Sequence, residues 1–260
     1  DFLASISEFS DQFPPILCLQ NGIENESNIA KVLGREKVIA GTVTTAIGKP
    51  KIGNILLQKQ RGIGIAAGHP LSQTIVDELN RVGLMATLYT NAMDMKWSKM
   101  LTNLLANASS AILDINPLSI FSDKDLFHLE IRQLREALAI MKAQGIKTTN
   151  LPGVPVKALA IAIKHLPLFI SKPLLTNAVG KGRGDKMPSF HIDLHSGRGK
   201  SEVNYLNGAV SRAGRKLRIP TPVNTTLNDL LTLLTNDNSQ IESFRNNPEH
   251  LLDLINITLE

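Results

Sequence analysis

Residues 91–113 read NAMDMKWSKMLTNLLANASSAIL, and this stretch decides how the rest of the chain is interpreted. It contains no Gly or Pro and is rich in Leu, Met and Ala, which predicts one continuous helix. Lys99, Asn103 and Asn107 are spaced i, i+4 and i+8, and each such step turns a helix by only about 40°, so they form one polar stripe. Two interpretations stay open: a solvated face, which the hydroxyl of Ser98 widens, or a row of donors for an anionic small molecule.

The part of the chain before this stretch, residues 1–90, contains short apolar runs that predict strands. The first run, at 16–20, is followed by Asn21-Gly22 and a helical pattern, which is one half of a βαβ crossover. Asn21 is therefore either a turn former or an amide that faces a cofactor, because open α/β sheets bind ligands at the carboxyl ends of their strands. A helix end is predicted at 3–13, and further strands are predicted at 38–46, 52–58, 62–67 and 85–89.

The part from residue 91 to residue 260 predicts helices only. Asn116-Pro117 ends the first helix, and Ser201 can cap a later one, with Glu202 at its positive end. Other helices are predicted at 123–144, 156–166, 189–195 and 223–234. The predicted fold class is an α/β N-terminal part followed by an all-α C-terminal domain.

The composition argues against several classes of protein. The net charge of +5 is spread along the chain, which suits an anionic small substrate or cofactor better than nucleic acid, and 4% aromatic residues argue against a base-stacking module. No apolar stretch approaches the roughly 20 residues of a membrane span. The single cysteine, Cys18, excludes an intrachain disulfide and fits a reducing cytoplasm, and we interpret it as a buried strand residue.

Several motifs are better explained without a ligand. The sequence GIGIAAG at 62–68 alternates like a strand and does not open a helix, so it is not a dinucleotide fingerprint. The basic glycine loops at 180–184 and 197–200 lack the spacing of a phosphate-binding loop. His191 and His195 are one helical turn apart, but Asp193 between them falls on another face, so no metal site is predicted.

Three segments match a known family in order and in residue type. LCLQNGIENE at 17–26 joins a strand, an Asn-Gly turn and a helix. In KWSKMLTNLLANASSAI at 96–112, Lys99, Asn103 and Asn107 stand at the positions where the family has Lys, Asn and Asn. The third segment, at 186–227, is KMPSFHIDLHSGRGKSEVNYLNGAVSRAGRKLRIPTPVNTTL. Together they resemble the ketopantoate reductase (2-dehydropantoate 2-reductase) family over nearly the whole chain. The resemblance implies that 1–90 is the C-terminal portion of a truncated Rossmann-like NADP-binding domain, and that 91–260 is an all-helical substrate and catalytic domain.

The resemblance also implies a role for each matched residue. Lys99 is the general acid that protonates the ketone oxygen as hydride arrives. The residues on the substrate side are Asn103, Asn107, Asn116 and Ser189. The residues on the cofactor side are Asn21, Ile47 and Glu202. The implied activity is the NADPH-dependent reduction of 2-dehydropantoate to pantoate in pantothenate biosynthesis, or of a closely related 2-keto acid, by a homodimer.

Two departures from the family pattern bear on these roles. The family's N-terminal strand and Gly-x-Gly-x-x-Gly loop, which hold the pyrophosphate, are not among the 260 residues, so we expect a longer protein and an inactive chain without that part. The loop SGRGK at 196–200 is one residue longer than in the commonest family pattern, which shifts Glu202 relative to Ser189. The alternative is a non-catalytic helical interaction or scaffold protein that reuses the fold.

Overall fold

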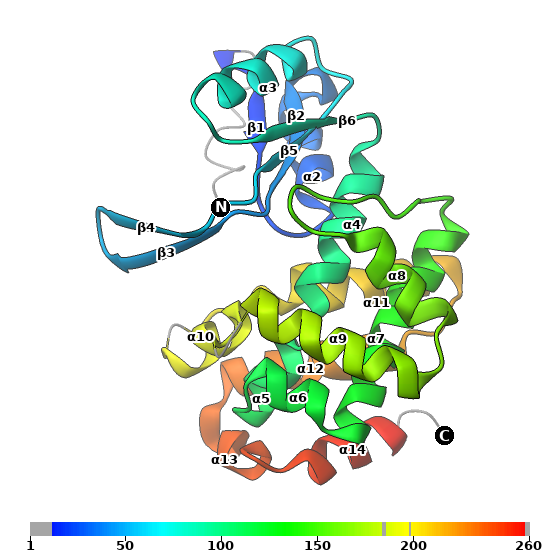
Figure 1. Cartoon of the computed structure of the whole chain (residues 1–260). Helices are drawn as coiled ribbons and strands as arrows, with labels where there is room; N and C mark the ends of the chain where they lie inside the picture. The colour runs from blue at the N-terminus through cyan, green and yellow to red at the C-terminus, as the bar shows by residue number, and fades with distance from the viewer. Residues whose placement is uncertain (1–11, 184–185, 198, 258–260) are drawn as a thin grey trace. The chain divides into compact units, whose positions relative to one another are not determined.

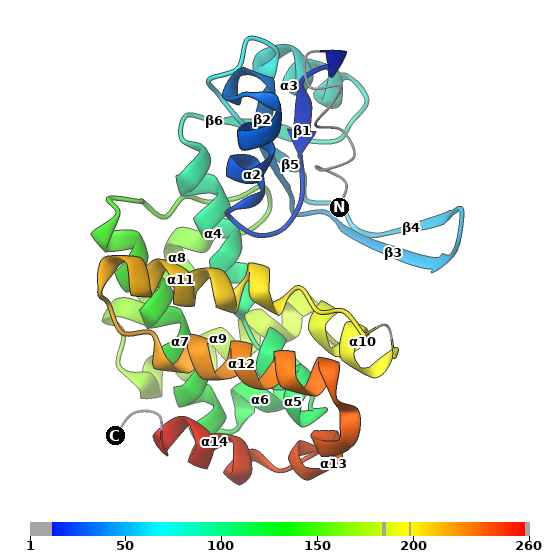
Figure 2. The same cartoon turned by 180° about the vertical axis from the view of Figure 1, so that it is seen from behind.

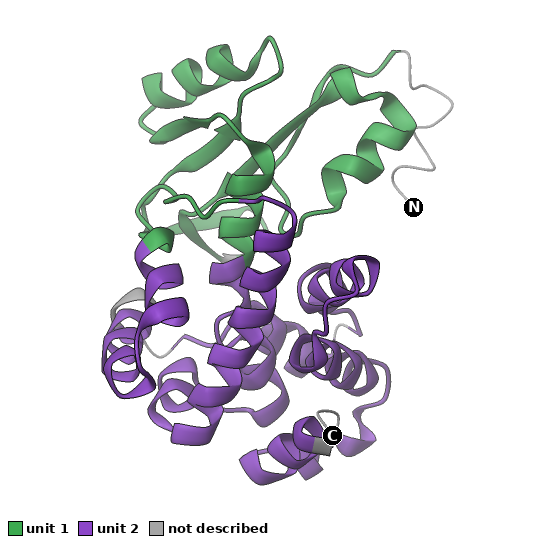
Figure 3. Ribbon diagram, turned by 90° about the vertical axis from the view of Figure 1, so that its right-hand side faces the viewer, with its two compact units in different colours: residues 1–100, 147–157 green, residues 101–146, 158–260 purple. Residues whose placement is uncertain are grey.

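The computed structural model describes residues 12–183, 186–197 and 199–257, so the helix end expected at 3–13 lies almost wholly outside the described residues. The chain forms two compact units (Figure 3). Unit 1 comprises residues 1–100 and 147–157, and unit 2 comprises residues 101–146 and 158–260. The boundary between the two units therefore falls after residue 100, inside the stretch 91–113 and later than the predicted domain boundary at residue 90.

Unit 1 is built on a four-stranded sheet of order β1-β2-β5-β6 (Figure 1). β1 (Ile16–Cys18) pairs in parallel with β2 (Val38–Val43), and β5 (Ile63–Ala66) pairs in parallel with β6 (Ala86–Tyr89), while β2 and β5 are antiparallel. α2 (Asn25–Leu33) and the short 3-10 helix η2 (Arg35–Lys37) connect the first parallel pair, and α3 (Ser72–Arg81) connects the second. Two βαβ units therefore share one sheet. The strand-turn-helix pattern that begins at residue 16 predicts the first unit, whereas the second is seen only in the structure.

The two crossover helices cover opposite faces of this sheet because side chains alternate along a strand. Cys18 of β1 packs with Leu33 of α2. Leu17, the next residue along, packs instead with the cluster that contains Ile65 of β5 and Val76 of α3. Each face of the sheet is thus closed by its own helix.

The strand predicted at 38–46 is confirmed over 38–43, but its predicted end is wrong, because a second strand begins at Ala46. β2 ends at Val43, and β3 (Ala46–Lys51) forms a separate antiparallel ribbon with β4 (Asn54–Lys59), which projects from the sheet (Figure 1). Thr44 lies at the corner between them, where its Oγ1 donates to the Pro152 carbonyl oxygen at 2.8 Å. That partner is more than a hundred residues away, so no local pattern indicates the corner.

The segment 147–157 belongs to unit 1 because side chains of α4 (Ala92–Leu104) bind its backbone. Asp94 Oδ1 accepts a hydrogen bond from Lys147 N, and Ser98 Oγ accepts one from Thr149 N, both at 2.8 Å. Ser98 is fully buried. It therefore does not widen a solvated face of the helix, which removes one support for the first interpretation of the polar stripe.

Unit 2 is helical, and four of its helices pack against the long helix α7 (Lys124–Ala143). These are α6 (Pro117–Ser122), α11 (Asn207–Leu217), α12 (Pro222–Asn236) and α14 (Pro248–Ile257). α11 and α12 lie side by side (Figure 2). The other elements are α5 (Asn107–Leu113), α8 (Val156–His165), α9 (Leu168–Arg183), α10 (Ser189–His195), η3 (Val203–Tyr205), η4 (Asn238–Gln240) and α13 (Ile241–Phe244). The α/β part followed by a helical part confirms the predicted fold class.

Glu136 of α7 fixes the start of α12. Its two carboxylate oxygens accept hydrogen bonds from the backbone N–H groups of Val223 and Asn224, each at 2.9 Å. Burial raises the pKa of the Glu136 carboxyl group above its ordinary value, and the hydrogen bonds from Asn224 oppose that shift. These bonds satisfy two of the N–H groups that the first turn of any helix leaves without an intrahelical partner.

The prediction of one continuous helix over 91–113 is wrong. α4 ends at Leu104 and α5 begins at Asn107. Between them Ala106 adopts the left-handed conformation, with φ 46° and ψ 26°. The helix predicted to begin at Ser201 also begins later, because 203–205 is a 3-10 turn and α11 starts at Asn207, although Ser201 Oγ does accept from Val203 N at 3.2 Å. Within the part of the chain that the structure describes, no helix combines the length and apolar character that a membrane crossing requires.

Candidate active site

The first turns of α4 are attached to the sheet of unit 1 by a buried cation, Lys96. Its ammonium group donates to the carbonyl oxygen of Gln20 at 2.7 Å and to that of Gly41 at 3.3 Å. It also pairs with Glu26 Oε1 of α2 at 2.7 Å, and the Lys96 side chain is only 3% exposed. Gln20 follows β1 directly, so Lys96 joins α4 to the edge of the sheet where α/β proteins bind dinucleotides.

Two residues predicted for the active site lie next to this attachment. Asn21 follows Gln20 and is exposed, and its carbonyl oxygen accepts from Asn25 Nδ2 at 2.6 Å, so its backbone takes part in the turn before α2. Lys99 is half-buried and lies one turn beyond Lys96 on α4, on the same side of the helix. The structure therefore supports the turn-forming interpretation of Asn21, and a contact with a cofactor stays a prediction.

Cys18 lies at the end of β1, close to the same ion pair. Burial raises the pKa of its thiol, and the negative charge of Glu26 raises it further. The thiol therefore stays protonated at neutral pH, which is the behaviour of a buried strand residue rather than of a nucleophile.

In unit 2 the structure brings together two residues predicted for the substrate side, Asn107 and Ser189. Asn107 is 4% exposed, and its Nδ2 lies 3.4 Å from Ser189 Oγ. Its Oδ1 accepts from Phe190 N at 3.1 Å, so the amide of Asn107 also caps the first turn of α10. Lys99 belongs to unit 1, and its convergence with this pair stays a prediction.

Asn107 owes its position to Glu130 of α7, which is fully buried. Glu130 Oε2 accepts from Ala106 N at 2.7 Å, and Oε1 accepts from Ser109 Oγ at 2.6 Å. The carboxylate thus replaces the helical acceptor that Ala106 N loses at the break between α4 and α5. Because of this break, Asn103 lies in the last turn of α4 and Asn107 begins α5, so the prediction that both share one continuous helix with Lys99 is wrong, and the convergence of the three side chains stays a prediction.

The remaining predicted residues lie in three different places. Asn116 is the N-cap of α6, where its Oδ1 accepts from Ser119 N at 2.9 Å. Glu202 is exposed and lines an open hollow together with Tyr205 and residues of α12. Ile47 is 53% exposed on the β3-β4 ribbon. Capping accounts for the oxygen of Asn116, so any contact of this residue with substrate falls to its Nδ2.

Sequence reasoning missed Lys96, Glu26 and Glu130. Lys96 carried one signal, since it stands between Met95 and Trp97, both of which are apolar and fully buried in the structure. A lysine in such surroundings needs a buried partner. Glu130 lies in a helix of mixed polarity, and its sequence context does not separate it from Asp125, the exposed carboxylate of the same helix.

Two family descriptions match the chain. "Ketopantoate reductase PanE/ApbA C terminal" matches residues 91–235, and "Ketopantoate reductase PanE/ApbA" matches residues 1–69. The 2-dehydropantoate 2-reductase of Streptococcus pyogenes serotype M6 is 24% identical over 211 residues, which are 80% of this chain and 62% of that protein. The 2-dehydropantoate 2-reductase of Lactococcus lactis subsp. lactis is 26% identical over 228 residues, which are 85% of this chain and 66% of that protein. The chain thus spans less than two thirds of the length of these relatives.

Solved structures share the fold at low identity. The PanE/ApbA family ketopantoate reductase from Ralstonia eutropha JMP134 has a TM-score of 0.73 at 21% identity, with 90% of this chain and 72% of that chain covered. A D-mandelate dehydrogenase in complex with NADH has a TM-score of 0.72 at 21% identity, with 90% and 74% covered. The dimeric ketopantoate reductase from Staphylococcus aureus has a TM-score of 0.66 at 18% identity, with 86% and 68% covered. At these identities the likeness establishes the fold alone.

Proposed function

Because the chain belongs to the ketopantoate reductase family, an oxidoreductase family, we propose that the protein reduces a 2-keto acid with NADPH. The proposed substrate is 2-dehydropantoate and the product is pantoate, which serves pantothenate biosynthesis. The observation that carries this proposal is the pairing of Asn107 with Ser189, two residues far apart in sequence whose family counterparts both bind substrate. Asn107 Oδ1 accepts from Phe190 N–H, and Nδ2 carries two N–H groups, so it can donate to a carboxylate as well as to Ser189 Oγ.

When bound, NADPH would supply the hydride that is added to the ketone carbon. The residues that would hold it are Asn21, Ile47 and Glu202, and all three are exposed. Asn21 fits the role best, because it stands at the carboxyl end of β1 in an intact βαβ unit. In this proposal residues 1–90 belong to the NADP-binding domain, and residues 91–260 form the substrate and catalytic domain.

Lys99 acts as the general acid in this proposal. As hydride reaches the carbon, negative charge develops on the ketone oxygen, and an ammonium group within hydrogen-bond reach stabilises that charge and then donates its proton. Asn103, Asn107, Asn116 and Ser189 orient the carboxylate and hydroxyl groups of the substrate. Amide and hydroxyl donors suit this task because they bind an anion without supplying a competing acid.

A bulkier 2-keto acid is the second candidate substrate, and NADH is the second candidate cofactor. The D-mandelate dehydrogenase of similar fold, solved with NADH, favours including both. The dimeric Staphylococcus aureus enzyme likewise supports a homodimer for this protein. The lone cysteine and the family's small-molecule chemistry agree with an enzyme of the cytoplasm.

The test is a steady-state assay of the full-length protein that follows loss of NADPH absorbance. Ketopantoate and phenylglyoxylate are compared as substrates, each with NADPH and with NADH. Lys99→Ala is expected to lower kcat by about 10²–10⁴-fold, the usual cost of a lost general acid. Ser189→Ala is expected to raise KM for the keto acid more than it lowers kcat. Lys142→Ala, which removes an exposed lysine of α7, serves as the control and leaves both constants unchanged.

Full activity of the Lys99→Ala variant contradicts the role of Lys99. If neither keto acid is reduced with either cofactor, the proposed reductase activity is contradicted and the non-catalytic scaffold alternative is favoured.

A further inference from the structure

Two imidazoles and a carboxylate meet where α10 packs against α5, apart from the residues assigned to the reaction. His191 and His195 lie one turn apart on α10, with their ring centroids 4.2 Å apart. Asp114 follows α5, and its Oδ1 lies 2.6 Å from His191 Nε2. One ligand atom from each of the three residues lies within 4.8 Å of the other two. Asp193 of the sequence HIDLH falls on another face of α10, so the acidic partner of the two histidines comes instead from Asp114, directly after α5.

Contacts behind the cluster hold two of these groups in place. His195 Nε2 donates to the Ala111 carbonyl oxygen of α5 at 3.1 Å. Arg245 Nε lies 3.2 Å from Asp114 Oδ2, the carboxylate oxygen that does not contact His191. Metal-binding histidines and carboxylates are commonly oriented by such outer contacts to carbonyl groups and charged side chains. Asp114 itself adopts a left-handed backbone conformation, with φ 54° and ψ 40°, which non-glycine residues seldom adopt.

We propose that Asp114, His191 and His195 form a binding site for a divalent transition-metal ion of the Zn²⁺ type. Two imidazoles and one carboxylate are a ligand set that zinc accepts, with a fourth position left for water. Bonds of about 2.0–2.1 Å around a tetrahedral ion place neighbouring ligand atoms roughly 3.3 Å apart. The contact of 2.6 Å between His191 Nε2 and Asp114 Oδ1 therefore widens when the ion binds, and all three ligand atoms settle well inside the 4.8 Å within which they already lie. The ion takes the place of the proton shared between His191 Nε2 and Asp114 Oδ1, and proton release therefore accompanies binding.

The position of the cluster indicates what the ion does. α5 carries Asn107 at its start and Asp114 after its end, and α10 carries Ser189 at its start and both histidines further along. At about 1.5 Å rise per residue, His195 lies roughly 9 Å along α10 from Ser189. The ion, held by Asp114, His191 and His195, would cross-link the two helices that present the proposed substrate groups, and the inference does not depend on the proposed reaction.

The experiment uses the untagged chain, stripped of metal with EDTA and dialysed. Zn²⁺ is titrated by calorimetry in two buffers of different ionisation enthalpy, and Co²⁺ is titrated by visible absorption. We expect one ion per chain, a buffer-dependent heat from proton release, a cobalt band typical of nitrogen and oxygen ligands, and a higher Tm with Zn²⁺. Removal of one ligand, in His195→Ala or Asp114→Asn, is expected to weaken binding at least about 100-fold, beyond the effect of losing an outer contact.

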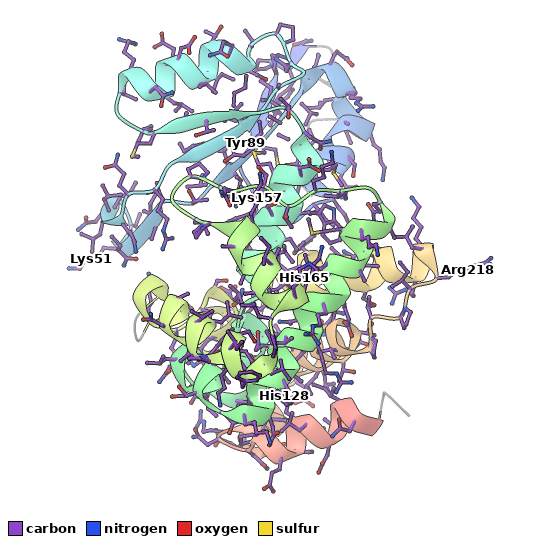
Figure 4. The ribbon with its side chains drawn as sticks, turned by 45° about the vertical axis from the view of Figure 1, so that its right-hand side comes forward. Lys51, Tyr89, His128, Lys157, His165 and Arg218 are labelled. Carbon is purple, nitrogen blue, oxygen red and sulfur yellow. The ribbon has the colours of Figure 1, made fainter. Side chains whose placement is uncertain are left out.

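His165→Ala is the matched control, because it removes an exposed histidine of α8 in the same unit (Figure 4). It should bind Zn²⁺ as the parent chain does. Circular dichroism reports whether each variant is folded, and Asp114→Asn is the mildest, since its amide oxygen can still accept from His191. A folded parent chain that shows no saturable Zn²⁺ binding overturns the proposal. Binding that persists unchanged in folded Asp114→Asn and His195→Ala overturns it equally.

Discussion

The two ends of the stretch 91–113 are fixed by buried charges of opposite sign, in different units and in different ways. In unit 1, Lys96 faces an opposite charge, Glu26, together with two backbone carbonyl groups. In unit 2, Glu130 receives hydrogen bonds from neutral groups, the Ala106 N–H and the Ser109 hydroxyl among them. Lys96 anchors α4 to a sheet, whereas Glu130 binds the backbone at the point where the same run of helical sequence is interrupted. The comparison teaches that the shape of this stretch depends on partners outside it.

The contrast has an energetic side. A buried charge is costly unless it is paired or hydrogen-bonded, and removing one partner leaves the others without their contacts. Glu130 is fully buried, whereas Glu26, the partner of Lys96, keeps 16% of its side chain exposed. Water can therefore partly replace Lys96 beside Glu26, but it has no comparable access to the groups around Glu130. We expect the larger loss of stability in unit 2.

The largest expected effect is that of Glu130→Ala. The change leaves the Ala106 N–H and the Ser109 hydroxyl without their acceptor and opens a small cavity, which together cost on the order of 3–5 kcal/mol. Urea unfolding followed by circular dichroism measures the loss. Glu130→Gln retains an acceptor and should lose less, and Glu242→Ala, which removes an exposed carboxylate, should change stability by less than about 0.5 kcal/mol. If the free energy of unfolding of Glu130→Ala lies within about 1 kcal/mol of that of the parent chain, the carboxylate does not stabilise the break between α4 and α5.

The second effect concerns the ion pair in unit 1. Lys96→Met keeps the length of the side chain but leaves the Glu26 carboxylate and the Gln20 carbonyl group without the ammonium group, so we expect a loss of about 2–4 kcal/mol. Glu26→Gln removes the unpaired charge, and the double variant should therefore be less destabilised than the sum of the two single changes. A double-mutant cycle by urea unfolding gives the coupling, expected at about 1–3 kcal/mol. A coupling near zero would mean that the carbonyl contacts alone account for Lys96.

The fold class follows from local signals, but the corrections do not. The apolar run at 16–20, followed by a turn and a helical pattern, indicates the first βαβ unit, because those signals lie within a few residues of one another. The sequence also indicates strands at 62–67 and 85–89, but their parallel pairing is seen only in the structure. The left-handed Ala106 has no such signal, since alanine favours helix and the acceptor that replaces its helical partner comes from Glu130. The corner at Thr44 likewise depends on Pro152.

The candidate site divides in the same way. Matched motifs indicated Asn107 and Ser189, which the structure then places 3.4 Å apart between amide nitrogen and hydroxyl oxygen. Asp114 was not assigned to any site, because its relation to His191 appears only when α5 and α10 pack together. Residue type could be inferred from sequence, whereas partners across helices required the fold.

The smallest expected effect sharpens the comparison at the break itself. Ala106 has a φ of 46°, a conformation that costs a residue with a Cβ about 1–2 kcal/mol but costs glycine little. Ala106→Gly should relieve this strain, but the loss of its buried methyl group and the greater freedom of glycine in the unfolded chain offset the gain, so the net change in stability is within about 0.5 kcal/mol of zero. Ala108→Gly, inside α5, should instead destabilise by about 1 kcal/mol or more, because a helix interior disfavours glycine and the buried methyl group is lost. Both variants are compared by urea unfolding under one set of conditions. A clearly smaller loss at 106 than at 108, two alanines that are equally buried, would identify 106 as the point where the helix is broken, and equal losses at both positions would contradict a break there.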